Sequence, residues 1–217
     1  MTYDSDDMRV SMDLIGRAVS NGKVFFSQEN LEAEFKRACE HILQLTEGAI
    51  ALYRNGNYGL VVFIALATIE EVTKTHISLY RRTPLIELPE KRKGDVLFDH
   101  SKKLQLALQN PMTISSATKD AIGEERLGKI LSDARSGKFK ELRESALYMD
   151  MVNGHFTTPS ELFGQRDAHD LLLLAIDAWS DALVGYSAHT FHVDKKMMAI
   201  FDELRESLSS DTPIRAT

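Results

Sequence analysis

A helical repeat of apolar residues is the feature that most limits what this chain can fold into. From Leu31 to Tyr53 apolar side chains recur at steps of three and four, which places them along one face of an α-helix. The sequence Asn55-Gly56-Asn57 then ends the repeat, because Asn and Gly tolerate the left-handed conformation that closes a helix. The pattern predicts a long amphipathic helix followed by a sharp turn.

The next segment is more apolar and predicts the centre of the fold. Residues 60–67 are apolar on every face, and the three β-branched residues among them could also form a buried strand. The continuation from Thr68 to Tyr80 favours a helix. We therefore expect one buried helix from about Tyr58 to Tyr80.

The rest of the chain continues the helical pattern. Further helices are expected at about 95–109, 117–134, 138–151, 158–186 and 193–208, separated by Pro, Gly and Asn residues. The segment Thr158-Pro159-Ser160-Glu161 combines a capping box with a proline at the first helical position. We predict a single all-α domain over residues 29–208, with an N-terminal extension at 1–28 and a polar tail at 209–217.

Charge and cysteine content narrow the class of protein. The 26 basic and 32 acidic residues give a net charge of -6, which argues against binding nucleic acid over the whole surface but not against a local basic groove. The single Cys39 excludes an intramolecular disulfide framework and favours a reducing cytosol. The acidic N-terminus lacks the features of a signal peptide, and the longest apolar run is shorter than the roughly 20 residues that cross a bilayer. We expect a cytoplasmic protein that has no membrane partner and no cofactor.

Charged residues on the predicted central helix point to a polar cluster. Glu70, Glu71 and Lys74 are separated by three and four residues, so one helix face can hold ion pairs between them. Burying such charges is costly unless they are paired. Two interpretations are open: a solvated face or structural ion pair, and a functional cluster inside the bundle.

Two further segments carry residues suited to phosphate chemistry. His100 and Lys103 share one face of the helix predicted at 95–109. Arg143 has a planar guanidinium that can bind a phosphate, and the Tyr148 hydroxyl could reach the same group. An ordinary histidine, a surface arginine and a partly buried tyrosine are the simpler interpretation of these residues taken alone.

The order of these motifs resembles the AbiV family of bacterial abortive-infection proteins. The resemblance extends from about Leu31 to Tyr186. The residues that carry it are Ile69-Glu70-Glu71-x-x-Lys74, His100-x-x-Lys103, Leu142-Arg143-Glu144-x-x-Leu147-Tyr148-Met149-Asp150, Asn153-Gly154 and Pro159. AbiV proteins are grouped with the HEPN superfamily of helical bundles, many of which are ribonucleases in phage defence and toxin–antitoxin systems. The resemblance implies an up-and-down helical bundle with additional C-terminal helices, a homodimer, and arrest of the infected cell through RNA or translation. It also allows a phage protein or an antitoxin as a partner.

The HEPN catalytic signature is an arginine followed after four to six residues by a histidine, and this chain departs from it. Here Tyr148 follows Arg143 after four residues. Histidine transfers protons near neutral pH, whereas tyrosine, with an ordinary pKa of about 10, does so poorly. One interpretation is a metal-independent ribonuclease, and the other is a non-catalytic protein that blocks translation or senses a phage component by protein contact. In the first, Arg143 stabilises the phosphate and His100 or Tyr148 handles protons. Three residues organise that site: Glu70, Glu71 and Lys74.

Basic residues between positions 81 and 103 are the predicted RNA contact. Most such charges simply solvate a surface, but two copies of the chain could align them along one RNA groove. The predicted residues are Arg81, Arg82, Lys91, Arg92, Lys93, Lys102 and Lys103. No metal site is predicted, because His189-x-x-His192 lacks a carboxylate or cysteine partner at a standard spacing.

Overall fold

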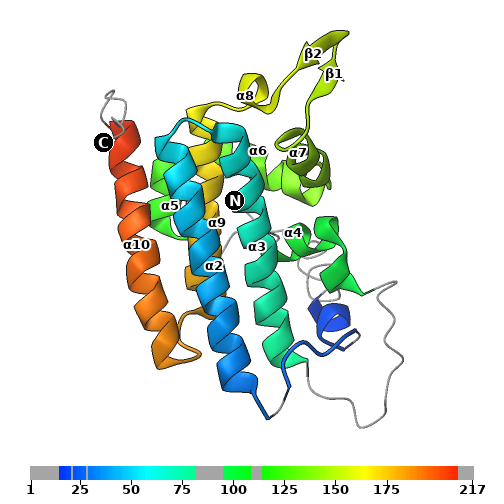
Figure 1. Cartoon of the computed structure of the whole chain (residues 1–217), viewed down its shortest axis with the longest axis vertical. Helices are drawn as coiled ribbons and strands as arrows, with labels where there is room; N and C mark the ends of the chain where they lie inside the picture. Colours follow the sequence, from blue (N-terminus) through cyan, green and yellow to red (C-terminus); the bar gives the residue numbers. More distant parts are fainter. Residues whose placement is uncertain (1–14, 21, 28, 82–94, 109–113, 210–217) are drawn as a thin grey trace.

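The computed structural model describes residues 15–20, 22–27, 29–81, 95–108 and 114–209 (Figure 1). Residues 15–20 are helical. The elements that follow are α2 (Leu31–Arg54), α3 (Tyr58–Tyr80), the 3-10 helix η1 (Val96–Phe98), α4 (His100–Leu108), α5 (Ser116–Ile122), α6 (Glu124–Arg135), α7 (Phe139–Ser145), β1 (Asp150–Val152), β2 (His155–Thr157), α8 (Pro159–Leu162), α9 (Gln165–Leu183) and α10 (Ala188–Ser209).

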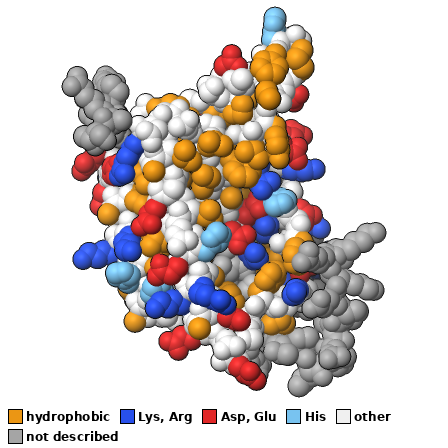
Figure 2. All heavy atoms as spheres, in the orientation of Figure 1, with side chains coloured by type: hydrophobic (Ala, Val, Ile, Leu, Met, Phe, Trp, Pro, Cys, Tyr) orange, Lys and Arg blue, Asp and Glu red, His pale blue; other side chains and the backbone are white. Residues whose placement is uncertain are grey.

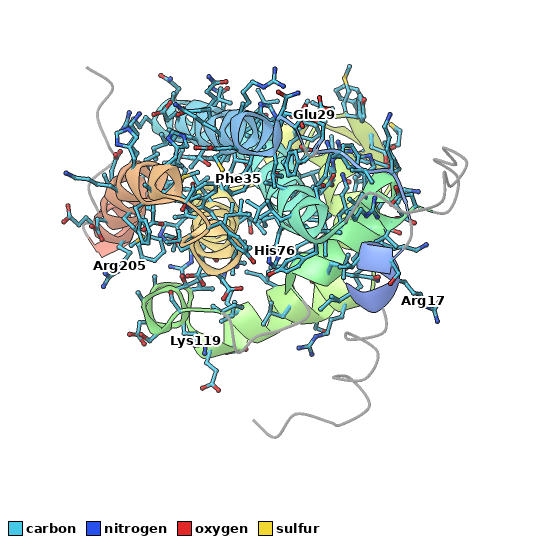
Figure 3. All side chains as sticks on the ribbon, turned by 90° about the horizontal axis from the view of Figure 1, so that it is seen from below. Arg17, Glu29, Phe35, His76, Lys119 and Arg205 are labelled. Atoms are coloured by element: carbon cyan, nitrogen blue, oxygen red, sulfur yellow. The ribbon has the colours of Figure 1, made fainter. Side chains whose placement is uncertain are left out.

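Four long helices form the body of the molecule. Seen nearly end on, α2, α3, α9 and α10 pack around a shared centre, with α3 in contact with both α2 and α9 (Figure 3). Most of the largest fully buried side chains come from α2, α3 and α9, among them Ile42, Leu66, Leu172 and Trp179. The predictions of an all-α bundle and of a buried central helix at about 58–80 are confirmed.

The shorter helices α4, α5, α6 and α7 cover the side of α3 and α9 that faces away from α2 (Figure 3). In α4, Leu104 and Leu108 are buried against the core, so this helix packs with one face on α3. In α7, Phe139 is buried in the same core. This packing brings polar residues of α4 and α7 to the middle of α3.

Glycine separates elements that the sequence pattern predicted as continuous. The helix expected at 117–134 is divided into α5 and α6 at Gly123, whose φ of 88° is strained for any residue with a side chain. Gly164 likewise lies between α8 and α9, within the helix expected at 158–186. In α5 and α6 the apolar periodicity continues across the break because both helices bury apolar side chains in the same core, among them Ile122 and Leu127.

The prediction of a helix at 138–151 is wrong for the second half of that segment. The helix α7 ends at Ser145, and residues 150–157 form a two-stranded antiparallel hairpin that projects from the body (Figure 1). Its two-residue turn is Asn153-Gly154, both with positive φ (52° and 80°). Asn-Gly is the preferred sequence for this kind of hairpin turn, because both central residues must adopt positive φ.

Among the described residues, no helix combines the length and the apolar character that crossing a membrane requires.

Candidate active site around Glu70

The carboxylate of Glu70 on α3 is surrounded by basic side chains from two other helices, α4 and α7. Its Oε2 atom is 2.5 Å from Nδ1 of His100 and 2.8 Å from Nζ of Lys103. Its Oε1 atom is 3.5 Å from Nε of Arg143. We call these four residues the Glu70 cluster.

Local structure explains why the four side chains meet. His100 and Lys103 are one turn apart at the start of α4, next to the buried Leu104, so packing of α4 on α3 brings both to Glu70. Arg143 is in the last turn of α7. Its guanidinium lies 4.8 Å from the ring centre of Phe63 on α3, a cation–π contact that holds it beside the carboxylate.

Exposure increases outward through the cluster. The side chains of Glu70 and Lys103 are only 3% and 6% exposed, whereas Arg143 is 24% and His100 is 48% exposed. One buried carboxylate therefore faces at least two permanent cations, Lys103 and Arg143. The excess positive charge reaches solvent at Arg143, beside the half-exposed His100, which suits an anion such as a phosphate.

Part of the hydrogen-bonding capacity of the cluster is unused. Within the described part of the chain, Glu70 Oε1 and Arg143 Nε are buried and face each other at 3.5 Å as an ion pair, but neither has a hydrogen-bond partner. Buried polar atoms are usually paired, and the unpaired ones mark places where a structure serves something other than stability. The Arg143 guanidinium is thus positioned by the carboxylate and by Phe63 without being saturated by them.

The Glu70–His100 contact determines which imidazole nitrogen can do chemistry. A carboxylate only accepts hydrogen bonds, so the contact places a proton on Nδ1 of His100. Nε2 is then left as the proton acceptor. A carboxylate that orients an imidazole in this way is a recurrent arrangement for general base catalysis.

Comparison with known proteins identifies the family. A family profile described as AbiV matches residues 31–180, more than two thirds of the chain. This chain belongs to the AbiV family. The family is an abortive-infection group of the HEPN superfamily, as the order of motifs indicated. No match was found among curated proteins or solved structures.

The match to AbiV covers all four residues of the Glu70 cluster. It begins at the first residue of α2 and ends within α9, so it contains α3, α4 and α7 and excludes α10. Some of the residues that carried the resemblance in the sequence are buried in the structure, such as Glu70 and Lys103, and others are exposed, such as Tyr148 and Met149.

Glu71, Lys74 and Tyr148 lie outside the cluster. Glu71 and Lys74 pair with each other over 3.1 Å, and both side chains are partly exposed. Lys74 also lies over the ring of Phe25. The Tyr148 side chain is exposed, and no hydrogen bond links it to the described residues of the cluster. Of the six predicted catalytic residues the structure therefore brings together Glu70, His100 and Arg143.

The predicted RNA-binding residues are in four different situations. Lys103 is buried in the cluster, and Lys102 is exposed with Nζ 3.5 Å from Asp99. The prediction that Arg81 contacts RNA is corrected by the structure. The Arg81 side chain is 2% exposed and pairs with Asp95 over 2.6 Å, so it does not reach a surface groove. The remaining four lie outside the described residues: Arg82, Lys91, Arg92 and Lys93.

The Arg81–Asp95 pair has a structural role, since it joins the end of α3 to the start of η1. Arg81 also donates to the carbonyl oxygens of Ala18 and Lys23. Burial alone would raise the pKa of Asp95. Hydrogen bonds from Arg81 and from the backbone N–H groups of Leu97 and Lys23, together with the Arg81 charge, instead hold it below its ordinary value.

Metal ligation finds no support in the described residues, where no group of three or more His, Cys, Asp or Glu side chains could hold an ion. His189 contacts Glu40 at 2.9 Å. Cys39 is buried, and its pKa is raised to about 12, chiefly by burial and also by the charge of Glu40.

Sequence reasoning missed two residues near the site. Phe63 lies in the apolar stretch of α3, where nothing distinguishes it from a core residue. Lys140 precedes Arg143 by three residues on α7 and lines the same open cavity as His100 and Lys102. The i, i+3 spacing of Lys140 and Arg143 was the available signal.

Proposed function

We propose that this AbiV-family protein is an effector of abortive infection that cleaves RNA without a metal ion, in the cytoplasm. The observation that carries the proposal is the buried Glu70 carboxylate holding His100 by Nδ1 beside the incompletely paired guanidinium of Arg143. A proton acceptor and a fixed cation within one cluster are what cleavage of a phosphodiester next to a 2′-hydroxyl requires.

In the proposed reaction, Nε2 of His100 accepts the proton of the 2′-hydroxyl as its oxygen attacks the adjacent phosphorus. The bond from phosphorus to the 5′ oxygen breaks, and that oxygen leaves with a proton taken from water. The products are a 2′,3′-cyclic phosphate and a 5′-hydroxyl end. Arg143 stabilises the negative charge that builds up on the phosphate oxygens, and Lys103 holds the Glu70 carboxylate in place. Tyr148 is assigned no step, since its side chain is outside the cluster.

The proposal is tested by incubating the purified protein with single-stranded RNA in the presence of a chelator. Replacing His100 by Gln or Arg143 by Gln should reduce the cleavage rate by roughly a hundredfold or more. Replacing the neighbouring Glu71 by Gln is the matched control, because Glu71 is on the same helix but outside the cluster. Undiminished cleavage by a folded H100Q variant, or no cleavage by the wild-type protein that still arrests growth, would overturn the proposal.

We also propose that the protein acts as a homodimer. The resemblance to HEPN proteins supports this, and two copies would present two Glu70 clusters to RNA. Light scattering of the purified protein at micromolar concentration should give twice the 24.4 kDa chain mass. A mass of one chain at every concentration would refute it.

A second candidate function is a non-catalytic one, in which the hairpin binds a protein of the phage or of the translation machinery. Apolar side chains gather on the upper part of the molecule and on the projecting hairpin (Figure 2). The exposed ones at and next to the hairpin are Tyr148, Met149, Met151, Val152 and Phe156. Contiguous exposed apolar residues mark interaction surfaces more often than chance. Growth arrest that is lost in M151S/F156S but retained in H100Q would favour this function over cleavage.

A further inference from the structure

We propose that the open cavity beside His100 binds the RNA phosphate next to the one that is cleaved, through Lys102 and Lys140. The assignment of that phosphate as the neighbouring one rests on the proposed function, whereas binding of an RNA backbone to the cavity does not. The cavity has a volume of about 440 Å³ and opens on the surface between α4 and α7. Its lining includes His100, Ser101, Lys102 and Lys140.

The two lysines reach the cavity from different helices. Lys102 is in the first turn of α4, two residues after His100, and its side chain is exposed. Lys140 is exposed near the start of α7, three residues before Arg143. Three residues of an α-helix rise by about 4.5 Å, so Lys140 lies roughly one turn along α7 from the guanidinium that faces the cluster. This distance along α7 is comparable with the distance between neighbouring phosphates of a single RNA strand.

The charge balance of the cavity favours an anion. Asp95 borders it, but that carboxylate is neutralised by Arg81. Asp99 is the other acidic residue of the lining, and its carboxylate is 3.5 Å from Nζ of Lys102. Lys140 forms no ion pair with the described residues, so its ammonium remains available. Both carboxylates of the lining are thus paired with a cation, which leaves the Lys140 ammonium as the excess charge beside the half-exposed His100.

Continuity with the Glu70 cluster identifies the anion as an RNA backbone. His100 belongs to both the cluster and the cavity, so a strand whose phosphate lies between His100 and Arg143 passes directly into the cavity. Lysine side chains neutralise backbone phosphates without reading the base, and we therefore expect binding of single strands with little sequence preference.

The test uses a fluorescent oligonucleotide with 2′-O-methyl groups, which has no free 2′-hydroxyl and cannot be cleaved. Its dissociation constant is measured by anisotropy across a series of KCl concentrations. The salt dependence of binding falls by about 0.7 in log–log slope for each single-strand phosphate contact removed. The K102Q/K140Q variant should therefore lose about 1.4 of the slope, equivalent to about 25-fold weaker binding at 0.1 M salt if affinities converge at 1 M. The matched control is K195Q/K196Q, which removes two exposed lysines from α10 and should leave the slope unchanged.

Failure of this inference and failure of the proposed function have different signatures. Lysine-dependent binding of the oligonucleotide without cleavage of ordinary RNA supports the cavity and overturns the nuclease. Cleavage that depends on His100, together with an unchanged slope in K102Q/K140Q, supports the nuclease and overturns the cavity. The cavity assignment also fails if the wild-type protein does not bind the oligonucleotide, or if it binds a polyglutamate peptide equally well. Both lysines are exposed, so thermal unfolding of the variant should match the wild type and exclude misfolding.

Discussion

Replacing Glu70 by Gln tests whether the cluster is a buried charge network. The substitution keeps the shape of the side chain and removes its charge. Arg143 and His100 are partly exposed and can turn to water, but Lys103, 6% exposed, cannot. The variant therefore leaves one buried ammonium without a counter-charge.

The size of the effect follows from that burial. Removing one partner of a buried ion pair costs about 3–5 kcal/mol, and the Gln amide oxygen can still accept one hydrogen bond from Lys103, which favours the lower end of the range. In a chain of this length each kcal/mol lowers the melting temperature by about 2–4 °C. We expect Glu70→Gln to lower it by roughly 6–12 °C. Glu71→Gln should lower it by less than about 4 °C, because the Glu71–Lys74 pair is partly exposed.

Thermal unfolding followed by circular dichroism at pH 7 measures these shifts. Combining Glu70→Gln with Lys103→Met should recover much of the lost stability, because the second substitution removes the unpaired charge and leaves an apolar side chain of similar length. If Glu70→Gln and Glu71→Gln have equal effects, or if Lys103→Met adds its own loss to that of Glu70→Gln, the cluster is not the charge network that the distances indicate.

Three further predictions concern the core and its connections. The Cys39 thiol, with its pKa raised to about 12 by burial, should resist alkylation at pH 8 in the folded protein and react only in denaturant. The lowered pKa of Asp95 contributes stability that is present above the unfolded value of about 3.9 and is lost as pH falls through the folded value. The gap in melting temperature between wild type and Asp95→Asn should therefore be large at pH 7 and shrink below pH 4; a constant gap would contradict it. A Cβ at Gly59 would lie 2.7 Å from Cβ of Pro159, so Gly59→Ala should cost about 1–3 kcal/mol, whereas Gly48→Ala, with open space around it, should be neutral or stabilising.

The bundle was predictable because its long helices are specified locally. Apolar periodicity located α2 and α3 to within one residue at each end. The hairpin was missed because Leu147 and Met149 extend the apolar spacing of α7, and Asn-Gly is as compatible with a helix end as with a hairpin turn.

The sequence identified residues that form the candidate site, but it did not show which of them contact each other. Helical spacing allowed Lys74 to pair with either glutamate, and on a helix that is apolar all round no periodicity shows which one is buried. The structure pairs Lys74 with Glu71 and turns Glu70 toward α4 and α7. Arg81 shows the reverse error, since it belongs to a basic run in sequence but is buried against Asp95, 14 residues further along. In both cases the partner is supplied by tertiary packing, which single-sequence spacing does not contain.

The position of Glu70 determines where any RNA chemistry of this protein can occur. Because the Glu70 carboxylate is buried on α3, the residues that it contacts reach solvent, within the described part of the chain, at His100 on α4 and Arg143 on α7. The chain has a net charge of -6, so we expect RNA to approach this basic edge rather than the rest of the described surface. Few phosphate contacts are then available. The total salt dependence of binding should be that of a small footprint of about three or four contacts, a log–log slope near -2 to -3. A slope of -6 or steeper would place RNA along an extended basic surface and contradict a site confined to the edge between α4 and α7.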